Sequence, residues 1–144
     1  RLNLNLNIQK KDFLKLTTNQ SVPSILLDAP CSALGTFRRN PDVASKINQS
    51  KLKRNQKIQI QMLDKAINIL DENGIIVYIV CSFHPFETIN VIDKIAQKHK
   101  NIRTLNLQSD KMIKRQNGYF INPLKFKDLG GSDIFFVSVL KKTK

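Results

Sequence analysis

Each of the two cysteines of the chain follows a short apolar run, Cys81 directly and Cys31 after three further residues, and a serine follows each cysteine. Residues 25–27 lead into Asp28-Ala29-Pro30-Cys31-Ser32, and residues 75–80 lead into Cys81-Ser82. Apolar runs of this length are typical of buried parallel strands, and in open α/β sheets ligands bind just beyond the carboxyl ends of such strands. The sequence therefore predicts that both thiols occupy the same structural place, where an ionised thiol could act as a nucleophile.

Each of these residues also has a simpler interpretation. A cysteine after an apolar strand commonly serves as a small buried hydrophobe, although the proline before Cys31 fixes the local backbone and favours a functional role. An acid is costly to bury without a partner, so Asp28 either belongs to a site or caps the following turn. Arg38 and Arg39 are either solvated loop charges or phosphate contacts, and His84 is either a loop residue or a catalytic base.

The elements that must position these residues alternate between strands and helices. Apolar and polar residues alternate over 1–10 and 102–107, which indicates half-buried strands, whereas apolar residues recur at helical spacing over 52–70. Asn73-Gly74 is typical of a helix C-cap. From 25 to 80 the pattern is strand, helix, strand, which predicts a right-handed parallel crossover. The other expected elements are a loop or short helical turn (13–24), a polar helix start near Asp42, a helix (87–99), a basic, turn-rich stretch (109–131) and a final strand (133–140).

Length and composition exclude several classes of protein. A chain of 144 residues that is 41% hydrophobic can bury one core, so we expect a single domain over residues 1–144. The longest apolar run is shorter than the roughly 18 residues needed to cross a bilayer. No signal-peptide layout and no metal-ligand spacing of cysteines occur. These features predict a cytoplasmic protein with free thiols, no membrane partner and no metal.

The charge balance points to a polyanionic partner. The chain has 24 Lys and Arg against 11 Asp and Glu, which gives a net charge of +13. Such a surface binds nucleic acid through phosphate contacts and counterion release. A Lys, Asn and Ile bias of the source genome would raise the charge in the same way, and charge alone does not distinguish RNA from DNA.

The spacing of the candidate residues is more specific than any one of them. Residues 28–42 read Asp-Ala-Pro-Cys-Ser-Ala-x-Gly-x-x-Arg-Arg-x-Pro-Asp, residues 74–87 read Gly-Ile-Ile-Val-Tyr-x-x-Cys-Ser-x-x-Pro-x-Glu, and residues 131–136 read Gly-x-Asp-x-Phe-Phe. From about residue 12 onward, this pattern resembles the RNA cytosine-5 methyltransferases of the RsmB/Nol1/Nop2/Sun family, most of all the bacterial enzymes that act on 16S ribosomal RNA.

The resemblance implies a role for each matching residue. Cys81 matches the nucleophile, which attacks C6 of the cytosine so that C5 can take the methyl group of S-adenosyl-L-methionine. Cys31 matches the cysteine that assists release of the covalent adduct. Asp28 matches an acid that interacts with the cytosine ring and, with Asp12, is expected to contact the cofactor.

The same resemblance implies how the RNA is held. The target base must leave its stack to reach such a pocket. The basic surface, with Arg38 and Arg39 as candidate phosphate contacts, would bind the RNA backbone.

The resemblance also implies an α/β, Rossmann-like methyltransferase fold with sheet order 3-2-1-4-5-7-6. This chain would supply strands 3, 4, 5, 6 and 7 and lack the first two strands together with the glycine-rich cofactor loop. Residues 2–8 would then have no neighbouring strand, and the strand at 25–27 would be an exposed edge. Smaller departures from the family are Val80 in place of threonine and Asn73 and Ile134 in place of glycines.

These expectations converge on one function and two alternatives. The parent activity is methylation of a cytosine in ribosomal RNA, with a missing N-terminal half as a possible partner and an isolated chain that is incomplete or inactive. The alternatives are an RNA-binding module without catalysis and a non-functional remnant of such an enzyme.

Overall fold

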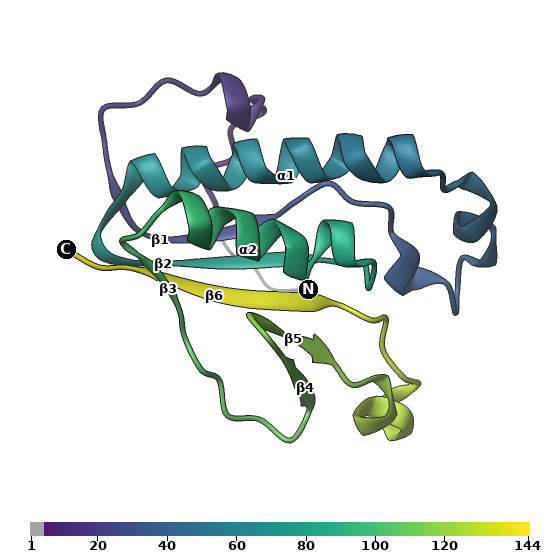
Figure 1. The fold of residues 1–144 in the computed structure, drawn as a ribbon. Helices are drawn as coiled ribbons and strands as arrows, with labels where there is room; N and C mark the ends of the chain where they lie inside the picture. Colours follow the sequence, from purple (N-terminus) through teal and green to yellow (C-terminus); the bar gives the residue numbers. More distant parts are fainter. Residues whose placement is uncertain (1–4) are drawn as a thin grey trace.

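The computed structural model describes residues 5–144, in which two α-helices pack on one face of a mixed sheet (Figure 1). The strands are β1 (Val22–Asp28), β2 (Leu70–Val80), β3 (Ile102–Thr104), β4 (Met112–Arg115), β5 (Gly118–Ile121) and β6 (Phe136–Lys142). The α-helices are α1 (Gln49–Ile69) and α2 (Ile89–Lys98). Short 3-10 helices connect them: η1 (Phe13–Lys15), η2 (Leu34–Thr36), η3 (Pro41–Lys46), η4 (Pro85–Glu87) and η5 (Pro123–Leu129).

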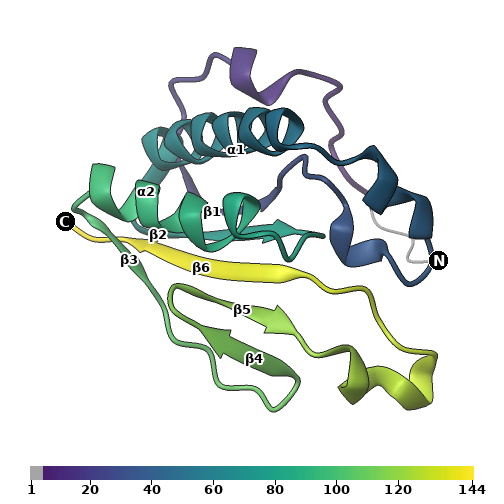
Figure 2. The ribbon, with the colours of Figure 1, turned by 45° about the vertical axis from the view of Figure 1, so that its right-hand side comes forward.

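The sheet has the order β1-β2-β6-β5-β4, and β3 pairs with the far end of β6. β1 and β2 are parallel, whereas β6 is antiparallel to β2. The hairpin β4–β5 continues from the start of β6 and leans away from the central strands (Figure 2). The parallel pair is what brings the segments after β1 and β2 to one end of the sheet.

The core lies between this sheet and the two helices. Leu63, Ala66 and Ile67 of α1 are fully or almost fully buried, as expected for positions three and four residues apart on one helix face. The amphipathic helix α2 buries its own stripe, and the sheet contributes alternate residues of β2. Asn48 caps α1 by accepting a hydrogen bond from the Lys51 amide over 2.9 Å. Over residues 5–144, no helix has the length and apolar character needed to cross a membrane.

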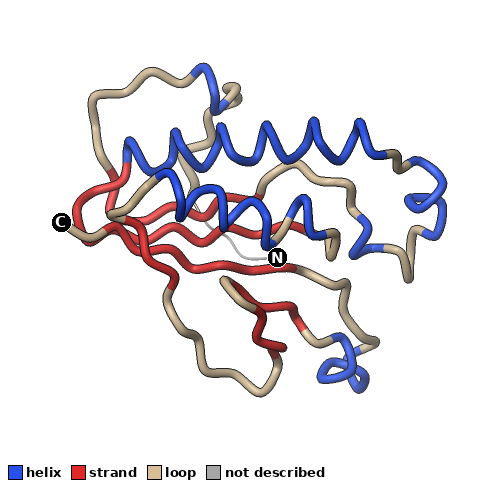
Figure 3. The backbone as a smooth tube through the Cα atoms, viewed as in Figure 1, coloured by secondary structure: helices blue, strands red, loops and turns tan. Residues whose placement is uncertain are grey.

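Neither α-helix covers the other face of the sheet (Figure 3). Leu26 is 73% exposed there, and its register neighbours Val77 and Val139 are half-buried. β1 is also an edge strand of the sheet in the described part of the chain, as the resemblance implied. This combination leaves an open edge next to an open face.

The principal elements of the sequence prediction are confirmed. The strands at 25–27, 75–80 and 133–140 correspond to β1, β2 and β6, and the helices at 52–70 and 87–99 correspond to α1 and α2. The parallel crossover is present between β1 and β2. The fold is α/β, as expected.

Two local predictions are wrong, and a third is incomplete. The expected strand at 1–10 lies partly outside the described residues, and its remainder, 5–10, forms no strand because no neighbouring strand pairs with it. α1 ends at Ile69, before Asn73, whose φ of 62° places it in a left-handed bend at the start of β2. The stretch at 109–131 contains the hairpin β4–β5 and η5, because its turn residues Gln116 and Asn117 reverse the chain between two short strands.

Candidate active site

The carboxyl ends of β1 and β2 bring the two cysteines together. Asp28 lies beside Ile79 in the parallel register, and the Ala29 amide extends the ladder by donating to the Ile79 carbonyl over 3.2 Å. Beyond this point the two segments converge, and Sγ of Cys31 lies 3.3 Å from Sγ of Cys81. Both thiols are free and half-buried. Two residues that are fifty positions apart therefore form one pair of thiols in hydrogen-bonding contact.

A buried carboxylate, that of Glu87, joins the same two segments. Its Oε1 accepts hydrogen bonds from the Ser32 amide and from Nδ2 of Asn55, both over 2.8 Å. Its Oε2 accepts from the hydroxyls of Ser32 and Ser82. The side chain is fully buried, and all four hydrogen-bonding partners of its oxygens are donors, as an ionised carboxylate requires. Glu87 therefore fixes the serine after each cysteine, and through the serines it fixes the separation of the two sulfurs.

Sequence reasoning assigned no role to Glu87. The residue stands in the quoted pattern Cys-Ser-x-x-Pro-x-Glu, so its place was visible, but one acid at a predicted helix start is ordinary. The signal that could have revealed it is the repeated Cys-Ser pair, since a hydroxyl buried after each strand requires a hydrogen-bond partner. Asn55, which comes from the middle of α1, carries no such signal.

The surroundings of Cys31 favour its neutral thiol. Burial, with smaller contributions from the neighbouring Cys81 and Glu87, raises the pKa of Cys31 to about 12, against the opposing effect of the hydrogen bond from the backbone of Ala33. Cys31 is therefore protonated at neutral pH and is available as an S–H donor. An S–H group 3.3 Å from Cys81 can stabilise a thiolate on that sulfur.

Gly35 closes the site on the side of β6. Its amide donates to the carbonyl of Cys81 over 2.9 Å, and its own carbonyl accepts from the Ile134 amide over 2.9 Å. A Cβ at this position would lie 1.9 Å from the Ile134 carbonyl oxygen, so no other residue fits without a backbone movement. Nearby, Nε of Arg39 pairs with Asp133 over 2.8 Å and ties the loop after β1 to the segment before β6.

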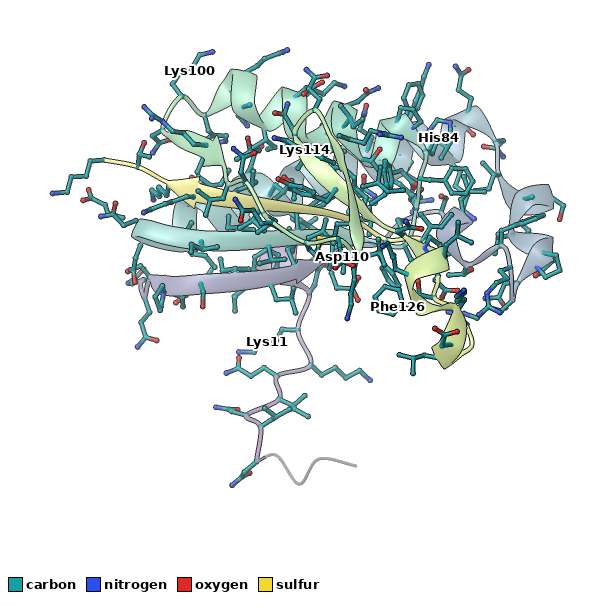
Figure 4. The ribbon with its side chains drawn as sticks, turned by 90° about the horizontal axis from the view of Figure 1, so that it is seen from below. Lys11, His84, Lys100, Asp110, Lys114 and Phe126 are labelled. Atoms are coloured by element: carbon teal, nitrogen blue, oxygen red, sulfur yellow. The ribbon has the colours of Figure 1, made fainter. Side chains whose placement is uncertain are left out.

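The predicted acids lie outside this network. Asp28 is exposed at the end of β1, and no hydrogen bond from residues 5–144 joins its side chain to either cysteine. Asp12 caps η1 by accepting from the Leu14 amide over 3.0 Å. The segment around Lys11 stands apart from the sheet (Figure 4), and η1 packs against α1. The structure thus brings the two thiols together but joins neither Asp28 nor Asp12 to them.

The remaining candidates have separate positions. Arg38 is exposed beside Gly131, and Arg39, although 58% exposed, is engaged by Asp133. His84 caps η4, because its Nδ1 accepts from the Phe86 amide over 3.2 Å. His84 is therefore a local helix cap, and within residues 5–144 its side chain has no hydrogen bond to either cysteine sulfur.

The residues present do not form a cradle for S-adenosylmethionine by themselves. Such cradles rely on glycines that let the backbone approach a ligand closely. Here the space beside Gly35, Gly74 and Gly118 is occupied by other atoms of the protein, and Gly130 and Gly131 form a left-handed turn after η5. The chain's own contribution is the pair of thiols and the network that holds them.

A mixed sheet covered by two helices on one face, with two thiols in contact at the carboxyl ends of its parallel strands, defines the class: an α/β domain with a candidate site for nucleophilic chemistry. Residues 1–141 match the family model described as 16S rRNA methyltransferase RsmB/F. The chain therefore belongs to the RsmB/F family.

Curated relatives and solved structures agree with this assignment. Ribosomal RNA small subunit methyltransferase B of Thermus thermophilus is 27% identical over 143 residues, which are 99% of this chain and 34% of the relative. Its counterpart in Photorhabdus laumondii is 32% identical over 86% of this chain and 27% of the relative. The fold resembles the crystal structure of NSun6 from Pyrococcus horikoshii with SFG, with a TM-score of 0.77 and 23% identity over 97% of this chain and 35% of that one. The chain thus spans about a third or less of these proteins.

Proposed function

We propose that this chain carries the covalent half of an RNA cytosine-5 methyltransferase reaction on ribosomal RNA. The observation that supports this most directly is the contact between Cys31 and Cys81 at 3.3 Å, with one of the two thiols held neutral. Neither sulfur is hydrogen-bonded to Glu87, because Glu87 binds the neighbouring serines instead. A pair arranged in this way suits one thiol as nucleophile and the other as its hydrogen-bond donor.

In the proposed reaction Cys81 acts as a thiolate. Its sulfur bonds to C6 of the cytosine, and the electron pair of the C5–C6 double bond makes C5 nucleophilic. Once C5 carries the methyl group, release breaks the bond between Cys81 and C6. C5 loses its proton to water, the C5–C6 double bond forms again and Cys81 departs as a thiolate. The S–H of Cys31 donates a hydrogen bond to the departing sulfur, which favours its departure.

S-adenosylmethionine would supply the methyl group, and its binding requires more than residues 5–144 provide. The open edge at β1 and the uncovered face around Leu26 suit additional strands and helices. We therefore propose that further polypeptide, in the same protein or in a separate chain, completes the sheet beyond β1. Asp28, exposed at that edge, would then face both the cofactor and the base, and the net charge of +13 would hold the RNA.

Trapping on RNA that contains 5-fluorocytosine tests the proposal when the chain is assayed together with the polypeptide that completes the sheet beyond β1. Fluorine at C5 blocks adduct breakdown after methylation, so a covalent band that requires S-adenosylmethionine and disappears in Cys81→Ala would support it. The Cys31→Ala variant should accumulate the adduct even on ordinary RNA. If Cys31→Ala instead abolishes the adduct, Cys31 is the nucleophile and the assignment of roles is wrong.

A second readout needs no methyl donor. Reversible attack at C6 makes C5 exchange its hydrogen with solvent, so RNA tritiated at C5 of cytosine should release tritium with the wild-type chain and not with Cys81→Ala. RNA binding without exchange or adduct would instead support the binding module. Absence of all three would support the non-functional remnant.

A further inference from the structure

We propose that an apolar groove beside Cys81 binds a nucleobase that flanks the reacting cytosine, and this inference rests on the proposed function. The groove consists of two adjoining cavities of about 440 and 250 Å³ that share Phe83, Pro123 and Ile134. Phe37 and Arg38 belong to the larger cavity, and Ile113 and Arg115 to the smaller one. We call this region the Phe83 groove.

The Phe83 groove adjoins the pair of thiols. Phe83 is two residues after Cys81 in the sequence. Gly35 and Ile134, which line the larger cavity, are the residues that connect the Cys81 carbonyl to the segment before β6. His84 and η5, with Phe126, lie at this same end of the sheet (Figure 4). A nucleotide next to a cytosine at Cys81 could therefore reach the groove.

The side chains of the groove are unusually exposed for their type. Phe37 is 50%, Phe83 46% and Ile113 39% exposed. Grouped apolar exposure of this kind marks an interaction site. Aromatic faces bind unstacked bases without regard to sequence, and RNA-binding proteins use them for this purpose.

The charges and one buried hydroxyl favour a nucleotide over an apolar protein segment. Arg38 and Arg115 line the two cavities, and no carboxylate of the described residues does. These arginines suit the phosphates on either side of a base. The Ser132 hydroxyl in the wall of the larger cavity is buried and has no hydrogen-bond partner within residues 5–144. It can therefore pair with the polar edge of a base.

The absence of tryptophan from the chain gives a direct test. A Phe83→Trp variant carries a single indole in the groove, and an indole is quenched when a base stacks on it. The ligand is a short single-stranded oligoribonucleotide that contains cytosine, and the comparison ligand is an abasic oligomer of the same length. The matched control is Ile8→Trp, because Ile8 is 82% exposed, belongs to no helix or strand and lines neither cavity of the groove.

We expect the RNA, but not the abasic oligomer, to quench the indole of Phe83→Trp, and neither to quench that of Ile8→Trp. Phe83→Ala should weaken RNA binding by about 5- to 100-fold, the range for loss of one stacked base, whereas Phe83→Tyr should retain it. Equal quenching at both positions, or wild-type affinity in Phe83→Ala, would overturn the inference.

The proposed function and the groove can fail separately. If the 5-fluorocytosine adduct forms at Cys81 while the Phe83 variants bind RNA as the wild type does, the groove is wrong and the reaction stands. If no variant and no wild-type protein binds RNA, both are overturned.

Discussion

Replacement of Glu87 by glutamine removes the carboxylate that joins the two cysteine segments. Glutamine keeps one oxygen for the Ser32 amide and for Asn55, but its NH₂ group faces two hydroxyls that now donate to Oε2. Hydrogen bonds to a charged group contribute about 1.5–3 kcal/mol each and neutral ones about 1 kcal/mol. Four weakened bonds, offset by the lower cost of burying an uncharged amide, should reduce the free energy of unfolding by about 2 to 4 kcal/mol.

Urea unfolding and thiol cross-linking measure the effect independently. The chain has one other glutamate, Glu72, which is exposed on β2. Glu72→Gln changes the net charge by the same amount and should stay within about 0.5 kcal/mol of the wild type. A mild thiol oxidant should join Cys31 to Cys81 readily in the wild type and in Glu72→Gln, and several-fold more slowly in Glu87→Gln. If Glu87→Gln unfolds at the wild-type urea concentration and cross-links at the wild-type rate, Glu87 does not hold the segments together.

Three further predictions concern the site and its support. Cys31 should react with iodoacetamide more slowly than an ordinary thiol at pH 7 by roughly 30-fold, because a pKa near 12 lowers its thiolate fraction about a thousandfold while its intrinsic nucleophilicity rises; the labelling rate of the Cys81→Ser variant, compared by mass spectrometry with that of free cysteine, measures this, and equal rates would contradict it. Gly35→Ala should destabilise the fold by several kcal/mol and abolish the adduct, because its Cβ would overlap the Ile134 carbonyl oxygen; a wild-type melting temperature would be incompatible with that contact. Asp64 has a lowered pKa, since hydrogen bonds from Lys98 and His99 at the end of α2 outweigh the effect of burial. Its contribution to stability, about 1 kcal/mol or less, should be present above the unfolded pKa near 4 and lost as the pH falls. In Asp64→Asn the free energy of unfolding should therefore fall less steeply as the pH is lowered below about 4.

The principal elements and the pairing of the thiols were accessible from the sequence because they depend on local rules. A short apolar run predicts a buried strand, and neighbouring parallel strands have their carboxyl termini at the same end of a sheet. Glu87 and Asn55 were not accessible as site residues, because their roles arise from contacts between α1, η4 and two separate loops. The alternation at residues 5–10 failed for a related reason: a strand requires a partner, and no pattern within one segment reveals whether a partner exists.

The repeated Cys-Ser pair explains how the site can be both rigid and reactive. A sulfur that is used to hold two segments together would lose the freedom to bond with a substrate, and a buried hydroxyl without a partner would destabilise the fold. Here Ser32 and Ser82 donate to Glu87 and lie 3.2 Å apart, while Cys31 and Cys81, one residue earlier in each segment, contact each other. The serines therefore fix the position of the two segments and leave the sulfurs of the cysteines available for the proposed chemistry. In the proposed reaction, attack on a base would therefore depend on the two loops and on Glu87, whereas methyl transfer would depend on the proposed polypeptide beyond the edge of β1.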